Sequence, residues 1–160
     1  MIIIEGMDNT GKTTLIETLI KEFNLPSIKS YRPRIEADIH QFHNWASACP
    51  ATVILDRHPA ISDLVYGHIL RGRSPSTLPI AHGCRANNTL IYCRPPNRTI
   101  LRSLNERTHL AGVTDHSLRL LEEYDLIMDE LEPDETYDYT LPRALQALIT
   151  NLTRTLAKCS

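Results

Sequence analysis

The chain has 160 residues, of which 42% are hydrophobic and 22% are charged, and its formal net charge is -2. This length and composition fit one globular domain whose core needs no disulfides or metal staples. No apolar run is long enough for a membrane span, and four scattered cysteines without a CxxC pair favour reduced thiols over a disulfide or zinc framework. We expect a single domain over residues 1–160, cytoplasmic (in the host cytoplasm if the source is viral) and without membrane contact.

Apolar residues alternate along the chain between the periods of strands and of helices. In chain order we expect strand 1–6, helix 12–23, strand 26–31, helix 35–48, strand 52–57, helix 61–70, a strand within 88–96, helices at about 98–109 and 117–131, strand 136–140 and helix 145–156. Residues 71–79 are rich in Gly, Ser and Pro, which predicts a loop. This alternation predicts an α/β fold with a parallel sheet of about five strands, which binds ligands at the carboxyl ends of its strands.

A glycine-rich stretch follows the first expected strand. Residues 6–13, GMDNTGKT, match the phosphate-loop pattern G-x-x-x-x-G-K-[ST] and run directly into an amphipathic helix. In such a loop, backbone N–H groups hold phosphate oxygens, the lysine reaches the β- and γ-phosphates, and the next hydroxyl binds Mg²⁺. The residues expected to bind ATP are Gly6, Asn9, Thr10, Gly11, Lys12, Thr13 and Thr14. The sequence therefore predicts binding of ATP, with Mg²⁺ as the cofactor.

Two aspartates are placed where they bear on this chemistry. Asp8 lies inside the loop, where a carboxylate is unfavourable beside a triphosphate but suits a second ligand with hydroxyl donors, such as a sugar. A loop aspartate that points outward is the alternative. Asp56 ends an apolar strand, where phosphate-loop enzymes hold a magnesium-binding acid. We expect Asp56 and Thr13 to hold the metal.

Charge is distributed unevenly behind the small net value. Residues 56–114 contain eight arginines, no lysine and three acids, whereas residues 115–138 contain ten acids and one arginine. Arginine is favoured where flat anions are bound through two hydrogen bonds, so the basic block indicates phosphate recognition. An unevenly charged solvated surface is the alternative. The acidic block is typical of a solvated helix face.

Four stretches carry the chemistry together. They are EGMDNTGKTT from Glu5, SYRPR from Ser30, LDRHPAISDLVYG from Leu55 and RPPNRTILRSLNER from Arg94. In this combination the chain resembles the thymidylate kinase family of P-loop nucleotide kinases. The resemblance implies that Asp8 contacts the sugar of an acceptor nucleotide, while Arg32 and Arg57 hold the acceptor's phosphate. It also implies that Asp56 supports the magnesium shell and that Tyr66 lies beside the acceptor.

The resemblance extends to the architecture. It implies a three-layer α/β/α P-loop kinase fold, a short arginine-bearing lid at about 105–116, and a homodimer. Gly67 stands where the family usually has a polar residue that reads the thymine edge, and the chain is shorter than typical members. The resemblance therefore points to a nucleotide kinase more strongly than to dTMP as its substrate.

Positive charge at the transferring phosphoryl group is expected from the lid. Phosphoryl transfer needs charge around the equatorial oxygens, and the loop has no arginine at positions 9 and 10. Arg98 and Arg102 are spaced to share a helix face, and Arg107 follows close to the next loop. We expect Arg102 and Arg107 to close on the triphosphate, with ion pairs to the acidic helix as the alternative.

The segment 39–46, IHQFHNWA, provides aromatic rings between the second and third strands. We expect Phe42 to stack on the acceptor base, with packing in the core as the alternative for these rings. The histidines at 58, 68, 82, 109 and 116 show no metal-ligand spacing and are expected to be structural or surface residues.

Two kinds of kinase and one non-catalytic function are compatible with these residues. The first is ATP- and Mg²⁺-dependent transfer to a free deoxynucleoside monophosphate. Its expected catalytic residues are Lys12, Asp8, Asp56, Arg57, Arg102 and Arg107. The second transfers to an alcohol, the hydroxymethyl group of a modified pyrimidine in DNA, as in viral base modification. Asp8 or Asp56 would then act as the base. A nucleotide-dependent switch is least favoured, because it has little use for Asp8 and an arginine lid.

Overall fold

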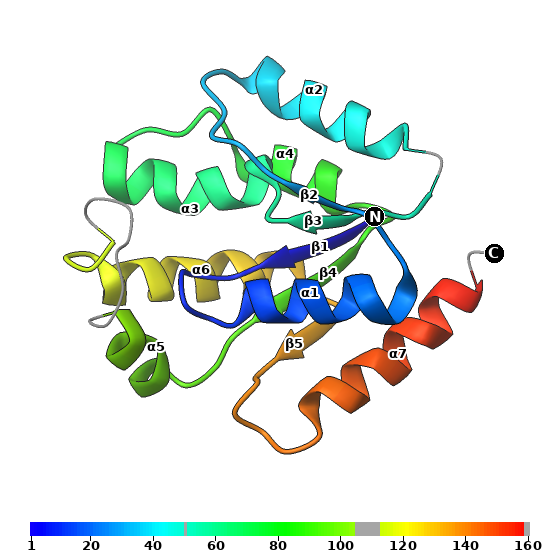
Figure 1. Ribbon diagram of the computed structural model, residues 1–160. Coiled ribbons are helices and arrows are strands. Elements are labelled where there is room, and N and C mark those ends of the chain that lie inside the picture. The colour runs from blue at the N-terminus through cyan, green and yellow to red at the C-terminus, as the bar shows by residue number, and fades with distance from the viewer. Residues whose placement is uncertain (50, 105–112, 159–160) are drawn as a thin grey trace.

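The structure, a computed structural model, describes residues 1–49, 51–104 and 113–158. In this part of the chain five parallel strands form one sheet in the order β2-β3-β1-β4-β5, with helices on both faces (Figure 1). The strands are β1 Ile2–Glu5, β2 Ser27–Lys29, β3 Ile54–Asp56, β4 Thr89–Cys93 and β5 Glu135–Tyr137. The helices are α1 Lys12–Phe23, α2 Glu36–Ser47, α3 Pro59–Arg71, α4 Leu78–Arg85, α5 Asn97–Leu104, α6 Ser117–Leu131 and α7 Ala144–Lys158. The predicted three-layer α/β/α fold is confirmed.

The two faces of the sheet bury separate cores, which explains why the first three residues of its central strand, β1, are all apolar. Ile2 and Ile4 pack with residues of α1 and α7, whereas Ile3 packs with the larger cluster of α2 to α6. All three isoleucines are at most 1% exposed. A strand covered on both faces needs a continuous apolar run rather than alternation. None of the described helices has both the length and the apolar character that crossing a membrane requires.

The register of the strands brings three loops to one edge of the sheet. Ile4 lies opposite Asp56, and Glu5 lies opposite Tyr92, so β1, β3 and β4 end at the same level. The backbone N–H of Arg57 donates to the carbonyl of Ile4 at 3.0 Å, which joins the turn after β3 to the end of β1. The residues with predicted chemistry therefore meet at this edge.

The structure departs from the sequence predictions mainly between β3 and β4. Helix α3 begins at Pro59, earlier than predicted, because proline suits the first helical turn and His58 caps it. Helix α4 was not predicted, because it has only eight residues, with Pro79 at its start and Gly83 inside. Of the lid predicted at about 105–116, residues 105–112 lie outside the described residues, and Val113 is buried.

Candidate active site

The phosphate loop connects β1 to α1 in a conformation that two glycines make possible. Gly6 has a φ of 139°, and a Cβ there would lie 2.6 Å from the carbonyl oxygen of Cys93. Gly11 has a φ of 86° and caps α1, and no side chain makes a capping hydrogen bond to the first N–H groups of this helix. The hydroxyl of Thr10 donates to the Met7 carbonyl at 2.9 Å and closes the loop. The loop is thus formed by local sequence, with its helix end directed outward for an anion.

Lys12 lies folded over this loop. Its ammonium group donates to the Met7 carbonyl oxygen at 2.5 Å and lies 3.4 Å from the hydroxyl of Thr10. The residue is 8% exposed, and burial, together with the positive charge of Arg57, lowers its pKa to about 7. Phosphate oxygens placed against Nζ would favour the charged form again.

Glu5 is a buried carboxylate at the site that the sequence predictions missed. It is 0% exposed and accepts hydrogen bonds from the His58 backbone N–H at 2.7 Å and from the hydroxyl of Ser62 at 3.0 Å. The Tyr124 hydroxyl lies 3.4 Å from its second oxygen. The available signal was an acid in an otherwise apolar strand, directly before the first glycine. Glu5 therefore holds the turn after β3 and the start of α3 against the phosphate loop.

The Glu5→Gln variant should have a flatter dependence of unfolding free energy on pH. Burial raises the pKa of Glu5 from 4.5 to about 7, so between these values the folded chain binds a proton that the unfolded chain does not. Stability from this group is complete below pH 4.5 and is lost as pH rises towards 7. The loss amounts to roughly 3 kcal/mol of unfolding free energy. Glutamine does not titrate, so this pH-dependent loss is absent in the variant. Urea unfolding from pH 4.5 to 8 measures this loss, and Glu17→Gln, at an exposed position of α1, is the control. Parallel curves of unfolding free energy against pH for Glu5→Gln and wild type would contradict the assignment.

Arg57 contacts two of the other predicted acceptor residues, Asp8 and Tyr66. Its Nη2 donates to Asp8 Oδ1 at 2.5 Å, to the Tyr66 hydroxyl at 3.1 Å and to the Gly6 carbonyl at 3.2 Å. Asp8 thus points towards Arg57 rather than outward. Arg57 has a φ of 70°, a backbone conformation unfavourable for a long side chain. Its buried Nε has no hydrogen-bond partner in the described part of the chain. An unpartnered buried donor is unusual in a folded protein, and here it lies on a guanidinium that Asp8 already pairs through Nη2.

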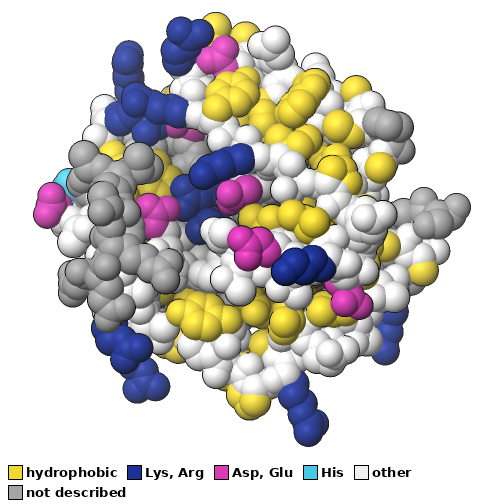
Figure 2. Space-filling view, viewed as in Figure 1, with side chains coloured by type: hydrophobic (Ala, Val, Ile, Leu, Met, Phe, Trp, Pro, Cys, Tyr) yellow, Lys and Arg dark blue, Asp and Glu magenta, His cyan; other side chains and the backbone are white. Residues whose placement is uncertain are grey.

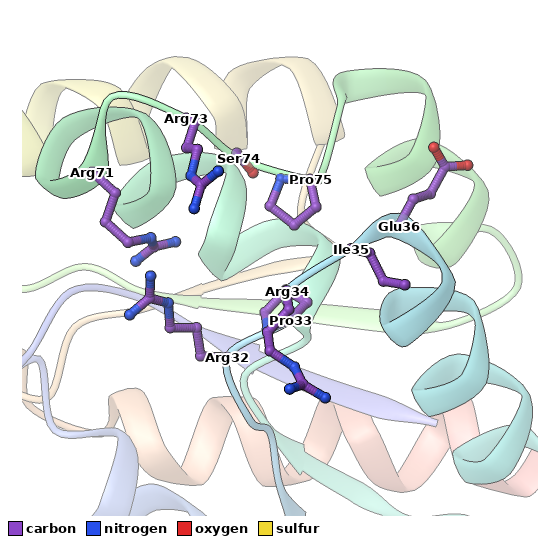
Figure 3. Close-up of a pocket in the computed structure, with 9 residues that line it drawn as sticks. All are labelled: Arg32, Pro33, Arg34, Ile35, Glu36, Arg71, Arg73, Ser74 and Pro75. Carbon is purple, nitrogen blue, oxygen red and sulfur yellow. The ribbon is translucent and has the colours of Figure 1, made fainter.

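Next to Arg57 lies a cavity of about 230 Å³, whose lining includes Tyr66, Ser62 and Asp63. It adjoins an open basin of about 890 Å³ lined by four arginines, Arg32, Arg34, Arg71 and Arg73, which we call the arginine basin (Figure 3). Arg32 and Arg71 line both spaces and extend towards one another from opposite walls. On the surface, Lys and Arg side chains gather on the side where the strands end (Figure 2). Two of the four arginines in the basin, Arg71 and Arg73, belong to the arginine-rich segment 56–114.

Gly67 explains how the end of α3 builds one wall of the basin. Arg71 pairs with Asp63, and the hydroxyl of Ser74 donates to the other Asp63 oxygen at 2.9 Å. The loop can approach this closely only because position 67 has no side chain. A Cβ on Gly67 would lie 2.7 Å from the Ser74 Cβ and 2.9 Å from the carbonyl oxygen of Arg73. The glycine is a packing requirement of the loop that carries Arg71 and Arg73.

The Gly67→Ala and Gly83→Ala variants are expected to shift stability in opposite directions. In a helix, alanine is normally more stable than glycine by about 1 kcal/mol. Gly83 in α4 has open space around it, so Gly83→Ala should gain about this amount. Gly67→Ala should lose about 1–3 kcal/mol, because the loop must move away. Chemical denaturation measures both; a stabilised Gly67→Ala variant would show that the loop does not pack as described.

A third cavity, of about 300 Å³, lies on the other side of the phosphate loop. Its lining includes Thr14, Ser103 and Tyr139. The amide of Asn9 donates to the Ser103 carbonyl at 2.9 Å and joins the loop to α5. Tyr139 is 41% exposed and its ring packs over Gly11. This ring was not among the predicted site residues, although an aromatic after the last strand was visible in TYDYT.

Thr13 and Asp56, the two predicted magnesium ligands, lie at the start of α1 and at the end of β3. Thr13 is exposed in the first turn of α1, and Asp56 ends β3 with a half-buried side chain. Within the described part of the chain, neither side-chain oxygen makes a hydrogen bond or an ion pair. A hydroxyl and a carboxylate are hard oxygen ligands of the kind that Mg²⁺ prefers.

Phe42 and Arg102 are among the predicted residues that line none of these cavities. Phe42 is 2% exposed and packs in the core against Tyr31, Trp45 and His58, so it does not line the cavity beside Arg57. An apolar ring on the inner face of α2 is covered by the sheet and α3, which explains the difference. Arg102 is exposed on α5. Arg107 lies outside the described residues.

Solved structures share this fold, whereas no family model and no curated protein matches the sequence. The YorR protein of Bacillus subtilis, in complex with phosphorylated GDP, has a TM-score of 0.74 and 21% identity over 98% of this chain and 95% of its own. Deoxyadenosine kinase from M. mycoides with bound dCTP has a TM-score of 0.63 and 14% identity over 96% of this chain and 98% of its own. Shikimate kinase from Acinetobacter baumannii, in complex with shikimate, has a TM-score of 0.61 and 14% identity over 99% of this chain and 93% of its own. The chain therefore has the fold of P-loop kinases.

Proposed function

We propose that this chain is a deoxynucleoside monophosphate kinase, which transfers the γ-phosphate of ATP to the phosphate of its acceptor. The observation that carries the proposal is Arg57, whose buried Nε is unpartnered while its Nη2 is fixed by Asp8 and Tyr66. A buried guanidinium donor of this kind fits a phosphate, which satisfies it with a charge-assisted hydrogen bond. Arg57 also follows directly on a strand that ends beside the phosphate loop.

The donor occupies the phosphate loop in this proposal. Backbone N–H groups at the start of α1 hold the phosphates, and Lys12 leaves the Met7 carbonyl for a phosphate oxygen. The cavity under Tyr139 takes the donor base, since a half-exposed aromatic ring offers a stacking surface. Two solved neighbours of this fold contain nucleotides, namely YorR with phosphorylated GDP and deoxyadenosine kinase with dCTP, which supports a nucleotide here.

The acceptor occupies the cavity beside Arg57. Arg57 and Arg32 bind its phosphate, and Asp8 accepts from a sugar hydroxyl. A phosphate oxygen is already ionised near pH 7, so the transfer needs no general base, and positioning with charge stabilisation does the catalysis. Thr13 and Asp56 would hold Mg²⁺, which when bound supplies positive charge to the phosphates.

The remaining parts of the proposal rest on the family resemblance. Arg102 and Arg107 would close over the triphosphate and neutralise charge on the transferring group. A thymidylate kinase-like specificity, a homodimer and a cytoplasmic location are proposed on the same ground.

The arginine basin favours a second candidate, a kinase for a hydroxymethyl group on a pyrimidine in DNA. Four arginines are more than one acceptor phosphate requires, and a nucleic acid strand would supply further phosphates. An alcohol acceptor needs a base, and Asp8 Oδ1 already accepts from Arg57 and Tyr66. That engagement makes Asp8 better suited to holding a hydroxyl than to removing its proton, so we rank this candidate second.

Transfer from γ-labelled ATP with Mg²⁺ tests the two candidates side by side. One acceptor set is free dTMP, dUMP, dCMP, dGMP, dAMP and 5-hydroxymethyl-dUMP, and the other is DNA with 5-hydroxymethylpyrimidines. Label in a free diphosphate supports the monophosphate kinase, and label in DNA alone overturns it. Asp8→Asn should then raise the acceptor KM more than it lowers kcat. A near-complete loss of kcat in Asp8→Asn and label in DNA would instead make Asp8 a base.

A further inference from the structure

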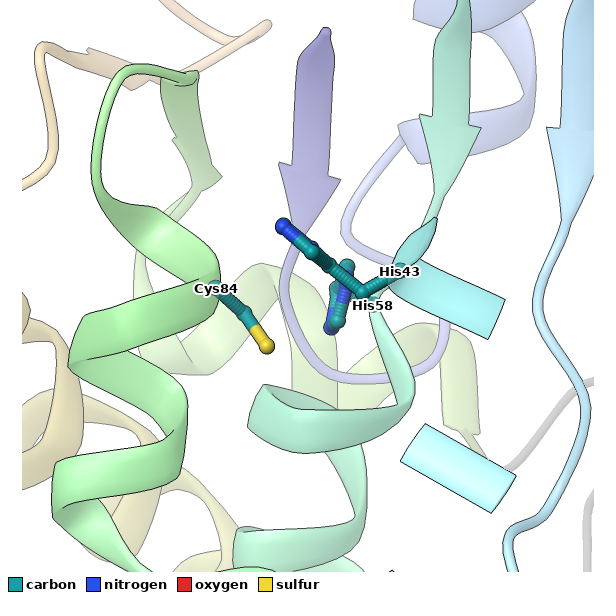
Figure 4. A group of neighbouring side chains, drawn as sticks. All are labelled: His43, His58 and Cys84. Carbon is teal, nitrogen blue, oxygen red and sulfur yellow. The ribbon is translucent and has the colours of Figure 1, made fainter. Parts of the chain in front are cut away.

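Two histidines and a cysteine from separate elements meet on the far side of the turn after β3. They are His43 of α2, His58 of the turn before α3, and Cys84 of α4, which we call the His-His-Cys cluster (Figure 4). The ligand atoms of the three residues all lie within 4.8 Å of one another. His58 is 0% and Cys84 4% exposed, whereas His43 is only half-buried. The cluster is therefore buried on the side of His58 and Cys84, and an ion can reach it from solvent past His43.

The distances suit a tetrahedral metal ion. Zinc bonds of about 2.0–2.1 Å to nitrogen place two tetrahedral nitrogen ligands about 3.3 Å apart. The Nδ1 of His43 and the Nε2 of His58 lie 3.2 Å apart. A zinc–sulfur bond of about 2.3 Å places sulfur about 3.6 Å from each nitrogen, so the Cys84 sulfur must approach by at most about 1.2 Å. Side-chain rotation of a cysteine provides a movement of this size.

Without metal, the two histidines form a hydrogen-bonded pair with a defined proton. The Nδ1 of His58 accepts from the Ala60 backbone N–H at 3.2 Å, so the neutral ring carries its proton on Nε2 and donates to His43. A metal on Nε2 moves this proton to Nδ1 and removes the cap of α3. Three metal–ligand bonds replace this single capping hydrogen bond, so metal binding outweighs the lost cap.

We propose that the His-His-Cys cluster binds a divalent metal of the zinc type, with the fourth position open past His43. Nitrogen and thiolate ligands select such metals over Mg²⁺, so this site is separate from the one at Thr13 and Asp56. Binding releases one proton from the Cys84 thiol. Because His58 caps α3 and directly follows Arg57, the ion acts on the turn that holds the acceptor arginine.

Cobalt titration of the whole chain, without nucleotide, tests the site independently of kinase activity. Co²⁺ bound to a thiolate gives a charge-transfer band in the near ultraviolet, and tetrahedral Co²⁺ gives intense visible bands. We expect both bands to saturate at one ion per chain and to be displaced by Zn²⁺. Cys84→Ser should abolish the charge-transfer band, and His43→Ala should weaken binding by at least about 10-fold.

Matched variants keep the result interpretable. Cys49→Ala removes a half-buried thiol outside the cluster, and His40→Ala removes an exposed histidine of the same helix, so both should leave the bands unchanged. His43 is half-buried, so His43→Ala is expected to fold even if Cys84→Ser does not. Absence of bands in the folded wild type, or bands that survive in His43→Ala with unchanged affinity, would overturn the proposal. Neither outcome bears on phosphoryl transfer measured with Mg²⁺ in buffer free of zinc and cobalt.

Discussion

The Lys12→Met variant is expected to lose phosphoryl transfer by roughly 10³-fold or more while it stays folded. Methionine fills the space of the lysine stem over the Met7 carbonyl but brings no charge to the phosphates. The fold should not suffer, because the site is unfavourable for the charged ammonium group. Lys12 is 8% exposed, and its burial lowers its pKa to about 7. Steady-state transfer from labelled ATP and thermal unfolding measure the two effects. A variant with more than about a tenth of wild-type kcat would show that Lys12 does not contact the transferring group.

Proton exchange gives Lys12 a second and independent test. Near pH 8 most of the free chain should hold Lys12 uncharged, and bound phosphates should restore its proton. ATP binding is therefore expected to take up protons between about pH 7 and 9. Calorimetry in two buffers of different ionisation enthalpy measures this uptake, and Lys12→Met should abolish it. The same lowered pKa makes Lys12 contribute a rise in stability from about pH 7 to 10.5, because the unfolded chain binds the additional proton.

The Arg57→Gly variant should lower kcat/KM for the acceptor by about 10²–10³-fold and leave the ATP dissociation constant nearly unchanged. Glycine removes the guanidinium but adopts the φ of 70° without strain, so the turn after β3 should keep its path. Arg57→Ala should show the same kinetic loss with about 1 kcal/mol less stability, because alanine is strained there.

Arg57→Lys separates charge from geometry in the same position. Lysine keeps the positive charge, but it has no planar fork to bind Asp8, Tyr66 and a phosphate together. We expect an acceptor KM between those of wild type and Arg57→Gly. Acceptor titrations of the three variants at saturating ATP measure it. An unchanged acceptor KM in Arg57→Gly would remove Arg57 from acceptor binding.

Local chemistry explains which parts of the site were predictable from the sequence. The phosphate loop depends on glycines at fixed spacing between a strand and a helix, and these are visible within 13 residues. The parallel sheet was predictable because strands buried on both faces read as continuous apolar runs, as in residues 2–4. The position of Asp56 and Arg57 beside the loop followed from the rule that parallel strands end at one edge.

Contacts between distant segments determined the rest. Phe42 faces the core because α2 packs its inner side on the sheet, which a pattern of aromatic letters does not reveal. Glu5 joins residues 58 and 62 through hydrogen bonds that have no sequence period. His43, His58 and Cys84 lack metal-ligand spacing, yet three elements bring their ligand atoms within 4.8 Å. Sequence by itself determined the fold and the phosphate loop, because both depend on neighbours along the chain. Only the tertiary structure decided the cavity beside Arg57, the arginine basin and the His-His-Cys cluster, because side chains far apart in sequence meet there through packing.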